Sequence, residues 1–73
     1  MTLLSEAGRA LYGDQWQSDL ARALDVDPRT VRRWASGSTT PRKGVYADLQ
    51  GLCNARMEEI KDICKRIENL DWR

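Results

Sequence analysis

The sequence predicts an all-α protein, a compact domain of four to five helices that contains a helix-turn-helix and ends in a C-terminal helix. Three observations support this fold class. Apolar residues recur every three or four positions along most of the chain. The segment 17–37 holds two short amphipathic stretches separated by a tight turn. With 73 residues, the chain has room for one small domain.

The first helix is expected over residues 2–12. Apolar residues Leu3, Leu4, Ala7 and Leu11 lie at helical spacing, and Gly13 marks the end of the helix. Thr2 is the candidate N-cap. Further along, an aspartate at 14 and a glutamine at 17 have the spacing of a capping box, which predicts the start of the second helix.

The two stretches within 17–37 form the helix-turn-helix. Asp27 and Pro28 predict a new helix start, because aspartate caps exposed N–H groups and proline fits the first helical position. Only residues 25–27 remain for the turn, so the two helices must cross steeply. Apolar spacing predicts a shared core made by Leu20, Ala21, Leu24, Val26, Val31 and Trp34. Trp34 could instead stack on a base, but its phase with Val31 favours the core.

This segment resembles the helix-turn-helix of transcriptional regulators of the Cro and lambda-repressor type. In that family, Gln17 would open the first helix of the motif and Ala21 would be the small residue between the two helices. The resemblance implies a lambda-repressor-like DNA-binding domain over residues 1–52. One position departs from the pattern, because the family usually has glycine in the turn and this chain has Asp25. Aspartate tolerates a left-handed backbone better than most residues.

Arginines on the second helix of the motif are the candidate base-reading residues. Arg29 and Arg33 share one face, and an arginine side chain matches the two acceptors of guanine in the major groove. Pro28 could meet a thymine methyl group, and Arg32 could reach either a base or a phosphate. Phosphate contacts are expected from polar and basic residues on the flanks and in the following loop, namely Gln17, Thr30, Ser38, Thr39, Thr40, Arg42 and Lys43.

The charge pattern supports a local interface for an anion. The formal net charge is only +1, yet residues 28–47 contain basic side chains and no acidic one. An ordinary solvated helix face, or for Arg42 and Lys43 an ordinary exposed loop, is the alternative interpretation.

Beyond the loop, Val45, Leu49 and Leu52 predict a helix that closes the core. A second apolar set follows within 53–73, where Ile60, Ile63, Ile67 and Leu70 have the spacing of a heptad seam. This seam could join two copies, bind a different protein or pack within the chain, and the homodimer is favoured. A two-fold dimer would place two DNA-reading helices about 34 Å apart on an inverted repeat.

Composition argues against several other classes of function. The chain contains no histidine, no Gly-rich phosphate loop and no evident nucleophile-base set, so neither an enzyme nor a metal, cofactor or small-molecule site is expected. Cys53 and Cys64 are expected to be reduced thiols, with an intermolecular disulfide as the alternative. The sequence shows no membrane span and no signal-peptide pattern, which predicts a cytoplasmic protein. The resemblance to Cro-type regulators implies a bacterial cell, or the host cell if the protein is phage-encoded.

The expected function is therefore that of a dimeric, sequence-specific regulator that binds double-stranded DNA, with a repressor or autorepressor as the form that the resemblance implies. One alternative is an antitoxin or inhibitor whose C-terminal helix binds another protein. A second alternative is the DNA-binding part of an enzyme such as a recombinase.

Overall fold

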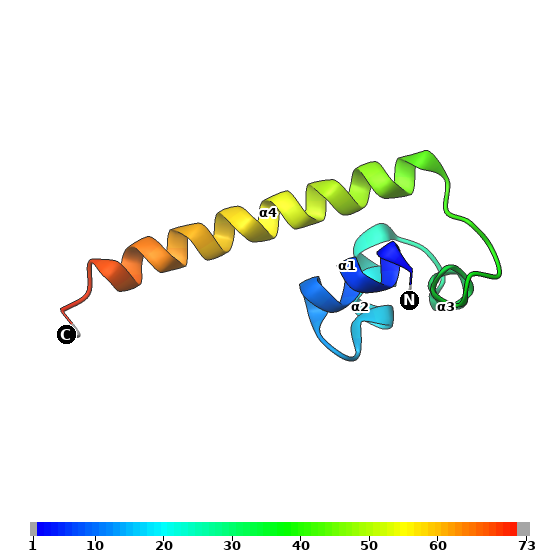
Figure 1. Ribbon diagram of the computed structural model, residues 1–73, viewed down its shortest axis with the longest axis horizontal. Helices are drawn as coiled ribbons and strands as arrows, with labels where there is room; N and C mark the ends of the chain where they lie inside the picture. Colours follow the sequence, from blue (N-terminus) through cyan, green and yellow to red (C-terminus); the bar gives the residue numbers. More distant parts are fainter. Residues whose placement is uncertain (1, 72–73) are drawn as a thin grey trace.

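The computed structural model describes residues 2–71, so Met1 and residues 72–73 of the predicted C-terminal segment lie outside the described part. It contains four helices: α1 (Leu3–Tyr12), α2 (Trp16–Leu24), α3 (Pro28–Ser36) and α4 (Lys43–Glu68). Residues 2–71 contain no strand. Helices α1 to α3 gather beside the first half of α4, and the second half of α4 extends away from them (Figure 1).

The all-α prediction is confirmed, but the prediction of a compact shape is wrong. The molecule measures 50 × 22 × 20 Å because α4 is a single helix of 26 residues. It runs without a break through the predicted boundary between residues 52 and 53. Helix α4 contains no proline, and neither Gly44 nor Gly51 interrupts the backbone hydrogen bonding of the helix. The structure therefore has four helices where up to five were expected.

Helix α1 begins and ends at the predicted signals. The Thr2 hydroxyl oxygen accepts a hydrogen bond from the Ser5 N–H at 3.1 Å, and Gly13 ends the helix with a φ of 84°. Leu4 and Leu11 are buried, whereas Leu3 is 70% exposed. The amphipathic pattern of α1 therefore starts at Leu4 and not at Leu3.

The start of α2 differs from the predicted capping box, and that prediction is wrong. Gln15, not Asp14, occupies the N-cap position, and no side chain caps the helix there. The reason is Trp16, which is only 3% exposed and already belongs to the first turn of the helix. Burial of the indole therefore decides where α2 starts, in place of a local hydrogen bond.

A single apolar core joins all four helices. Its buried members are Leu4, Trp16, Leu20, Ala21, Val31, Trp34 and Leu49. Ala21 allows α2 to lie close to α3, and Gly8 has the same role between α1 and α2. A Cβ atom on Gly8 would overlap the Trp16 indole ring. The sequence pattern missed Gly8, because nothing local shows that a tryptophan will lie on it.

We expect Gly8→Ala to destabilise the fold by about 1–3 kcal/mol, because the added methyl group forces the Trp16 ring out of its position. The matched control is Gly51→Ala, also within a helix, where an added Cβ atom meets no atom within 4 Å. That control should stabilise the protein by about 0.5–1 kcal/mol through helix propensity. Urea unfolding followed by circular dichroism measures both changes, and equal effects would contradict the close approach.

Arg56 fastens α4 to the end of α1. Its Nη1 donates a hydrogen bond to the Leu11 carbonyl at 2.6 Å, and its guanidinium lies 5.6 Å from the centre of the Tyr12 ring. The carbonyls in the last turn of a helix lack partners within the helix, so the arginine supplies one. This contact marks the end of the folded domain, which consists of α1 to α3 and the first half of α4. The second half of α4, which we call the projecting half, begins there (Figure 1).

Candidate nucleic-acid interface

The connection between α2 and α3 consists of residues 25–27, as predicted. Asp25 has φ 56° and ψ 48°, and it is the one non-glycine residue with positive φ among residues 2–71. Hydrogen bonds hold the turn, because the Val26 N–H donates to the Ala21 carbonyl at 2.9 Å and the Asp25 N–H donates to the Arg22 carbonyl at 3.3 Å. The turn therefore keeps the left-handed conformation without a glycine.

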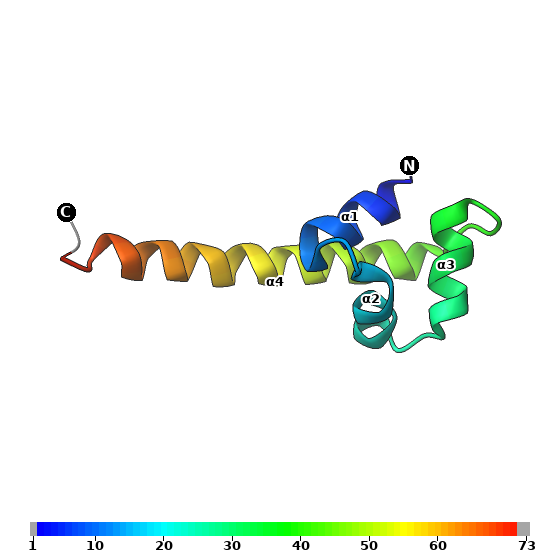
Figure 2. The same cartoon turned by 90° about the horizontal axis from the view of Figure 1, so that it is seen from below.

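The start of α3 is set by Asp27 and Pro28. The Asp27 Oδ1 accepts a hydrogen bond from the Arg29 N–H at 2.8 Å, and Pro28 fills the first turn. Helix α3 is seen end-on in Figure 1 and stands upright in Figure 2, whereas α4 lies horizontally in both views. Helix α3 thus crosses the long axis of the molecule at one end, next to the start of α4.

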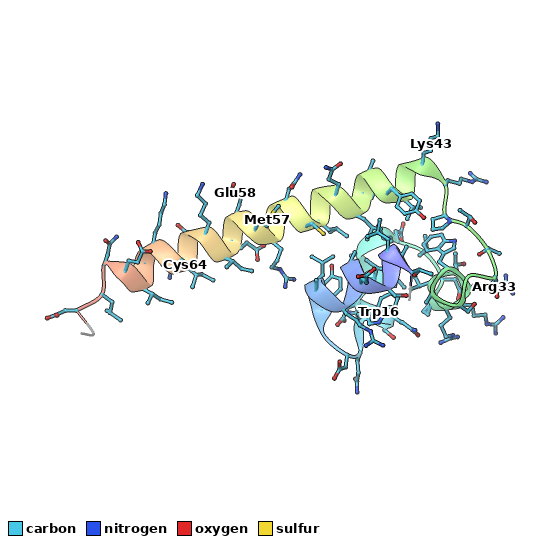
Figure 3. All side chains as sticks on the ribbon, viewed as in Figure 1. Trp16, Arg33, Lys43, Met57, Glu58 and Cys64 are labelled. Atoms are coloured by element: carbon cyan, nitrogen blue, oxygen red, sulfur yellow. The ribbon has the colours of Figure 1, made fainter. Side chains whose placement is uncertain are left out.

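The core fixes which side of α3 faces outward. Val31 is fully buried and Trp34 is 9% exposed, so the remaining faces carry the exposed Arg29, Arg32 and Arg33. These three arginines and Ser36 line one open hollow on the protein surface. Figure 3 shows Arg33 on the outer side of α3 and Lys43 at the start of α4, at the same end of the molecule.

The other predicted core residues of the motif are arranged around this helix. Leu20 and Ala21 are buried, and Leu24 and Val26 are partly buried against the same cluster. Pro28 is exposed beside Arg29, and Thr30 is half-buried on the flank of α3. The apolar residues therefore hold α3 in place without covering its arginine side chains.

The basic side chains at this end of the molecule retain their hydrogen-bond donors for a ligand. Within residues 2–71, the ion pairs join Arg22 to Asp19, Arg56 to Glu59 and Arg66 to Asp62. In the same part of the chain, no carboxylate lies within ion-pair distance of the basic groups at positions 29, 32, 33, 42 and 43. Such arginines can donate paired hydrogen bonds to a base edge or a phosphate.

A second hollow, between α1, α2 and α3, adds a residue that the sequence interpretation missed. Its polar lining includes Arg9, Gln17, Arg32 and Ser36. Arg32 borders both hollows. Arg9 reaches this place because α1 packs on α2, and no local pattern in α1 indicates it.

The loop after α3 is partly organised by its own hydrogen bonds. Gly37 has a φ of 82°, and the Ser38 N–H donates to the Arg33 carbonyl at 3.0 Å. The Ser38 and Ser36 hydroxyls lie 2.8 Å apart and are hydrogen-bonded. Thr39 and Thr40 are exposed in the loop, Arg42 is the N-cap of α4 and Lys43 is its first residue.

The second half of α4 and the residues just after it carry a second exposed surface, which we call the apolar stripe: Met57, Ile60, Ile63, Ile67 and Leu70. The three isoleucines are 52%, 49% and 49% exposed. The structure therefore does not pack them against the helices of their own chain. Helix α4 ends at Glu68, so Leu70 lies after the helix and does not continue the predicted heptad.

Both cysteines also lie on α4, Cys53 half-buried and Cys64 exposed, and both are free thiols. Among the helices of residues 2–71, none is long and apolar enough to cross a membrane. Comparison of the chain with protein-family models, with curated proteins and with solved structures found no match.

Proposed function

We propose that the protein is a sequence-specific, double-stranded DNA-binding transcriptional regulator that acts as a dimeric repressor on an inverted-repeat operator. One observation carries the proposal. Three arginines project from the outer side of a helix that a buried core holds at the end of the molecule, with no carboxylate of residues 2–71 paired to them.

In the proposed complex, α3 enters the major groove with its N-terminal half leading. Arg29 and Arg33 each donate two hydrogen bonds to a guanine, because the planar guanidinium matches the O6 and N7 acceptors. Pro28 contacts a thymine methyl group. Arg32 contacts a flanking base or, through the second hollow, a phosphate.

Phosphate contacts surround these base contacts. Gln17 and Thr30 lie at the edges of the two helices, and Arg42 and Lys43 follow the exposed loop. Thr39 and Thr40 add hydroxyl donors, whereas Ser38 must exchange its bond to Ser36 to do so. These contacts position the protein and do not read the sequence of the DNA.

A second copy of the chain completes the regulator. The net charge of one copy is only +1, so a dimer doubles the phosphate contacts available on one site. The apolar stripe supplies the contact surface, since its side chains are about half exposed in the single chain. The preference for a repressor over an activator, and for a cytoplasmic setting, rests on the resemblance to Cro-type regulators.

The exposed stripe also favours one other function, that of an antitoxin or inhibitor whose α4 binds a different protein. Purification of the chain without any other protein distinguishes these two functions. A stable homodimer supports the regulator, whereas aggregation that a co-expressed neighbouring gene product relieves supports the inhibitor.

Arg42→Ala is expected to weaken binding to all DNA sequences by a similar factor, because Arg42 contacts a phosphate. The slope of log K against log salt should fall by about 1 for each lost phosphate contact. Lys61→Ala is the matched control, since Lys61 is also exposed but lies on the projecting half of α4. A loss confined to one operator would contradict the phosphate role.

Selection of bound sites from random double-stranded DNA tests the proposed function itself. We expect an enriched inverted repeat with guanines in each half-site. An enriched single site without symmetry would contradict the dimeric regulator, and no enrichment over random DNA would contradict sequence-specific binding altogether.

A further inference from the structure

We infer that two copies of the chain associate as an antiparallel pair of α4 helices, in which the apolar stripe of each copy packs on the stripe of the other. This inference rests on the proposed dimer and specifies its geometry. It follows from where the stripe lies relative to the folded domain.

The apolar stripe lies on the same side of α4 as Leu49 and Arg56, two residues through which α4 contacts the other helices. Leu49 is buried in the core, and Ile60 and Ile67 follow it after about three and five helical turns, which keeps all three close to one line along the helix. Arg56, between them on the same side, is bound to the end of α1. One face of α4 is therefore covered by α1 to α3 in its first half and exposed in its second half.

This arrangement excludes a parallel pair. A parallel partner that packs on the stripe would continue along the same face and meet Tyr12 and the end of α1. Helices α1 to α3 lie beside the first half of α4 and not beside its second half, as Figure 1 shows. An antiparallel partner meets no such obstacle. The helices α1 to α3 of each copy then lie beyond the C-terminal end of the other copy's α4. The exposed segments of the two copies, residues 57–68 of α4, then lie side by side.

The side chains that flank the stripe also fit an antiparallel pair. Glu59 and Arg66 lie on one flank, and Met57 and Cys64 lie on the other. Reversing one helix sets each flank beside the same flank of the partner. Glu59 then lies beside the oppositely charged Arg66 of the second copy in two symmetry-related contacts. Both side chains also pair within their own chain, Glu59 with Arg56 and Arg66 with Asp62. On the other flank, the apolar Met57 and Cys64 meet each other. In a parallel pair, Glu59 would instead face Cys64.

The antiparallel pair separates the two DNA-facing ends of the dimer. Lys43, at the start of α4, lies about 30 Å from the middle of the stripe at 1.5 Å per residue, so the two copies of Lys43 lie about 60 Å apart. This distance is nearer to two turns of B-DNA than to the single turn predicted from the sequence.

Distance measurement between the two copies tests the orientation. A nitroxide label on Lys43→Cys, in a chain that also carries Cys53→Ala and Cys64→Ala, should give an inter-label distance of about 60 Å. A distance below about 25 Å would overturn the antiparallel orientation and leave the dimer standing, since paired helix axes lie about 8–10 Å apart. A monomer would overturn both. Site selection from random DNA tests the DNA-binding proposal separately.

Scattering from the unmodified chain provides a second measurement. One copy is 50 Å long, and the antiparallel dimer should have a longest dimension of about 80 Å. A parallel dimer would keep a longest dimension close to that of one copy. The smaller value would overturn the proposed orientation.

A charge exchange distinguishes the two orientations by affinity. Glu59→Arg should weaken the dimer about two- to five-fold, and adding Arg66→Glu should restore the original affinity, because the two positions face each other. In a parallel pair, position 66 does not face position 59, so the second change would not restore the affinity. Failure of the rescue would therefore contradict the antiparallel pair.

Discussion

Replacing Arg29 or Arg33 with alanine is expected to cost about 1–3 kcal/mol of binding free energy on the selected operator, which is a loss of about 5- to 150-fold in affinity. Binding to an unrelated duplex should change little, because base contacts add affinity only on the correct sequence. Both side chains are exposed on α3, so the free energy of unfolding should stay within about 0.5 kcal/mol of the original. Fluorescence anisotropy with the two duplexes measures the difference.

Arg33→Lys sharpens this test. Lysine keeps the positive charge but lacks the planar pair of donors, so operator affinity should fall while non-specific affinity is kept. Arg22→Ala is the control, because Arg22 is an exposed arginine at the last turn of α2, paired with Asp19 at 3.4 Å. Unchanged operator affinity in both alanine variants would remove the base-reading assignment. Equal losses on both duplexes would make these arginines phosphate contacts.

Ile63→Asp combined with Ile67→Asp is expected to convert the dimer to monomers. Each isoleucine is 49% exposed in the single chain, so completing its burial contributes about 1 kcal/mol. A dimer loses four such side chains, or about 4 kcal/mol, which is roughly a thousand-fold in the dissociation constant. Four carboxylates in the contact add a further penalty for the desolvation of charge. Sedimentation equilibrium or light scattering measures the result.

The matched control is Lys61→Asp combined with Lys65→Asp, which places two aspartates at the same spacing on the side of α4 away from the stripe. That variant should remain dimeric. Both double variants should keep the domain folded, since the affected residues lie outside the buried core. A dimer that persists in the isoleucine variant would move the contact to another surface, and the antiparallel arrangement would fall with it.

Signals local to a few residues predicted much of the fold. The Thr2 cap, the Gly13 stop and the Asp27–Pro28 start all reappear as helix ends, because each depends on hydrogen bonds or backbone angles within a single turn. The turn at 25–27 also follows from the sequence, including the left-handed Asp25. Predictions of this kind need no knowledge of the rest of the molecule.

Other features depended on which helices touch. The capping box at Asp14 was a plausible local pattern, but burial of Trp16 on Gly8 moved the start of α2. Arg9 joins the hollow that holds Gln17 and Arg32 only because α1 lies against α2. Both outcomes follow from packing between segments, which spacing within one segment does not report.

Helix α4 separates the two sources of information most clearly. Its apolar period and the absence of a helix breaker are properties of the sequence, as are the local caps, the three-residue turn and the row of arginines. The sequence does not determine whether the isoleucines are buried or exposed, because their burial depends on how far the other helices extend along α4. They reach Arg56 and stop, which leaves the apolar stripe uncovered within the described chain and determines which orientation a second copy can take.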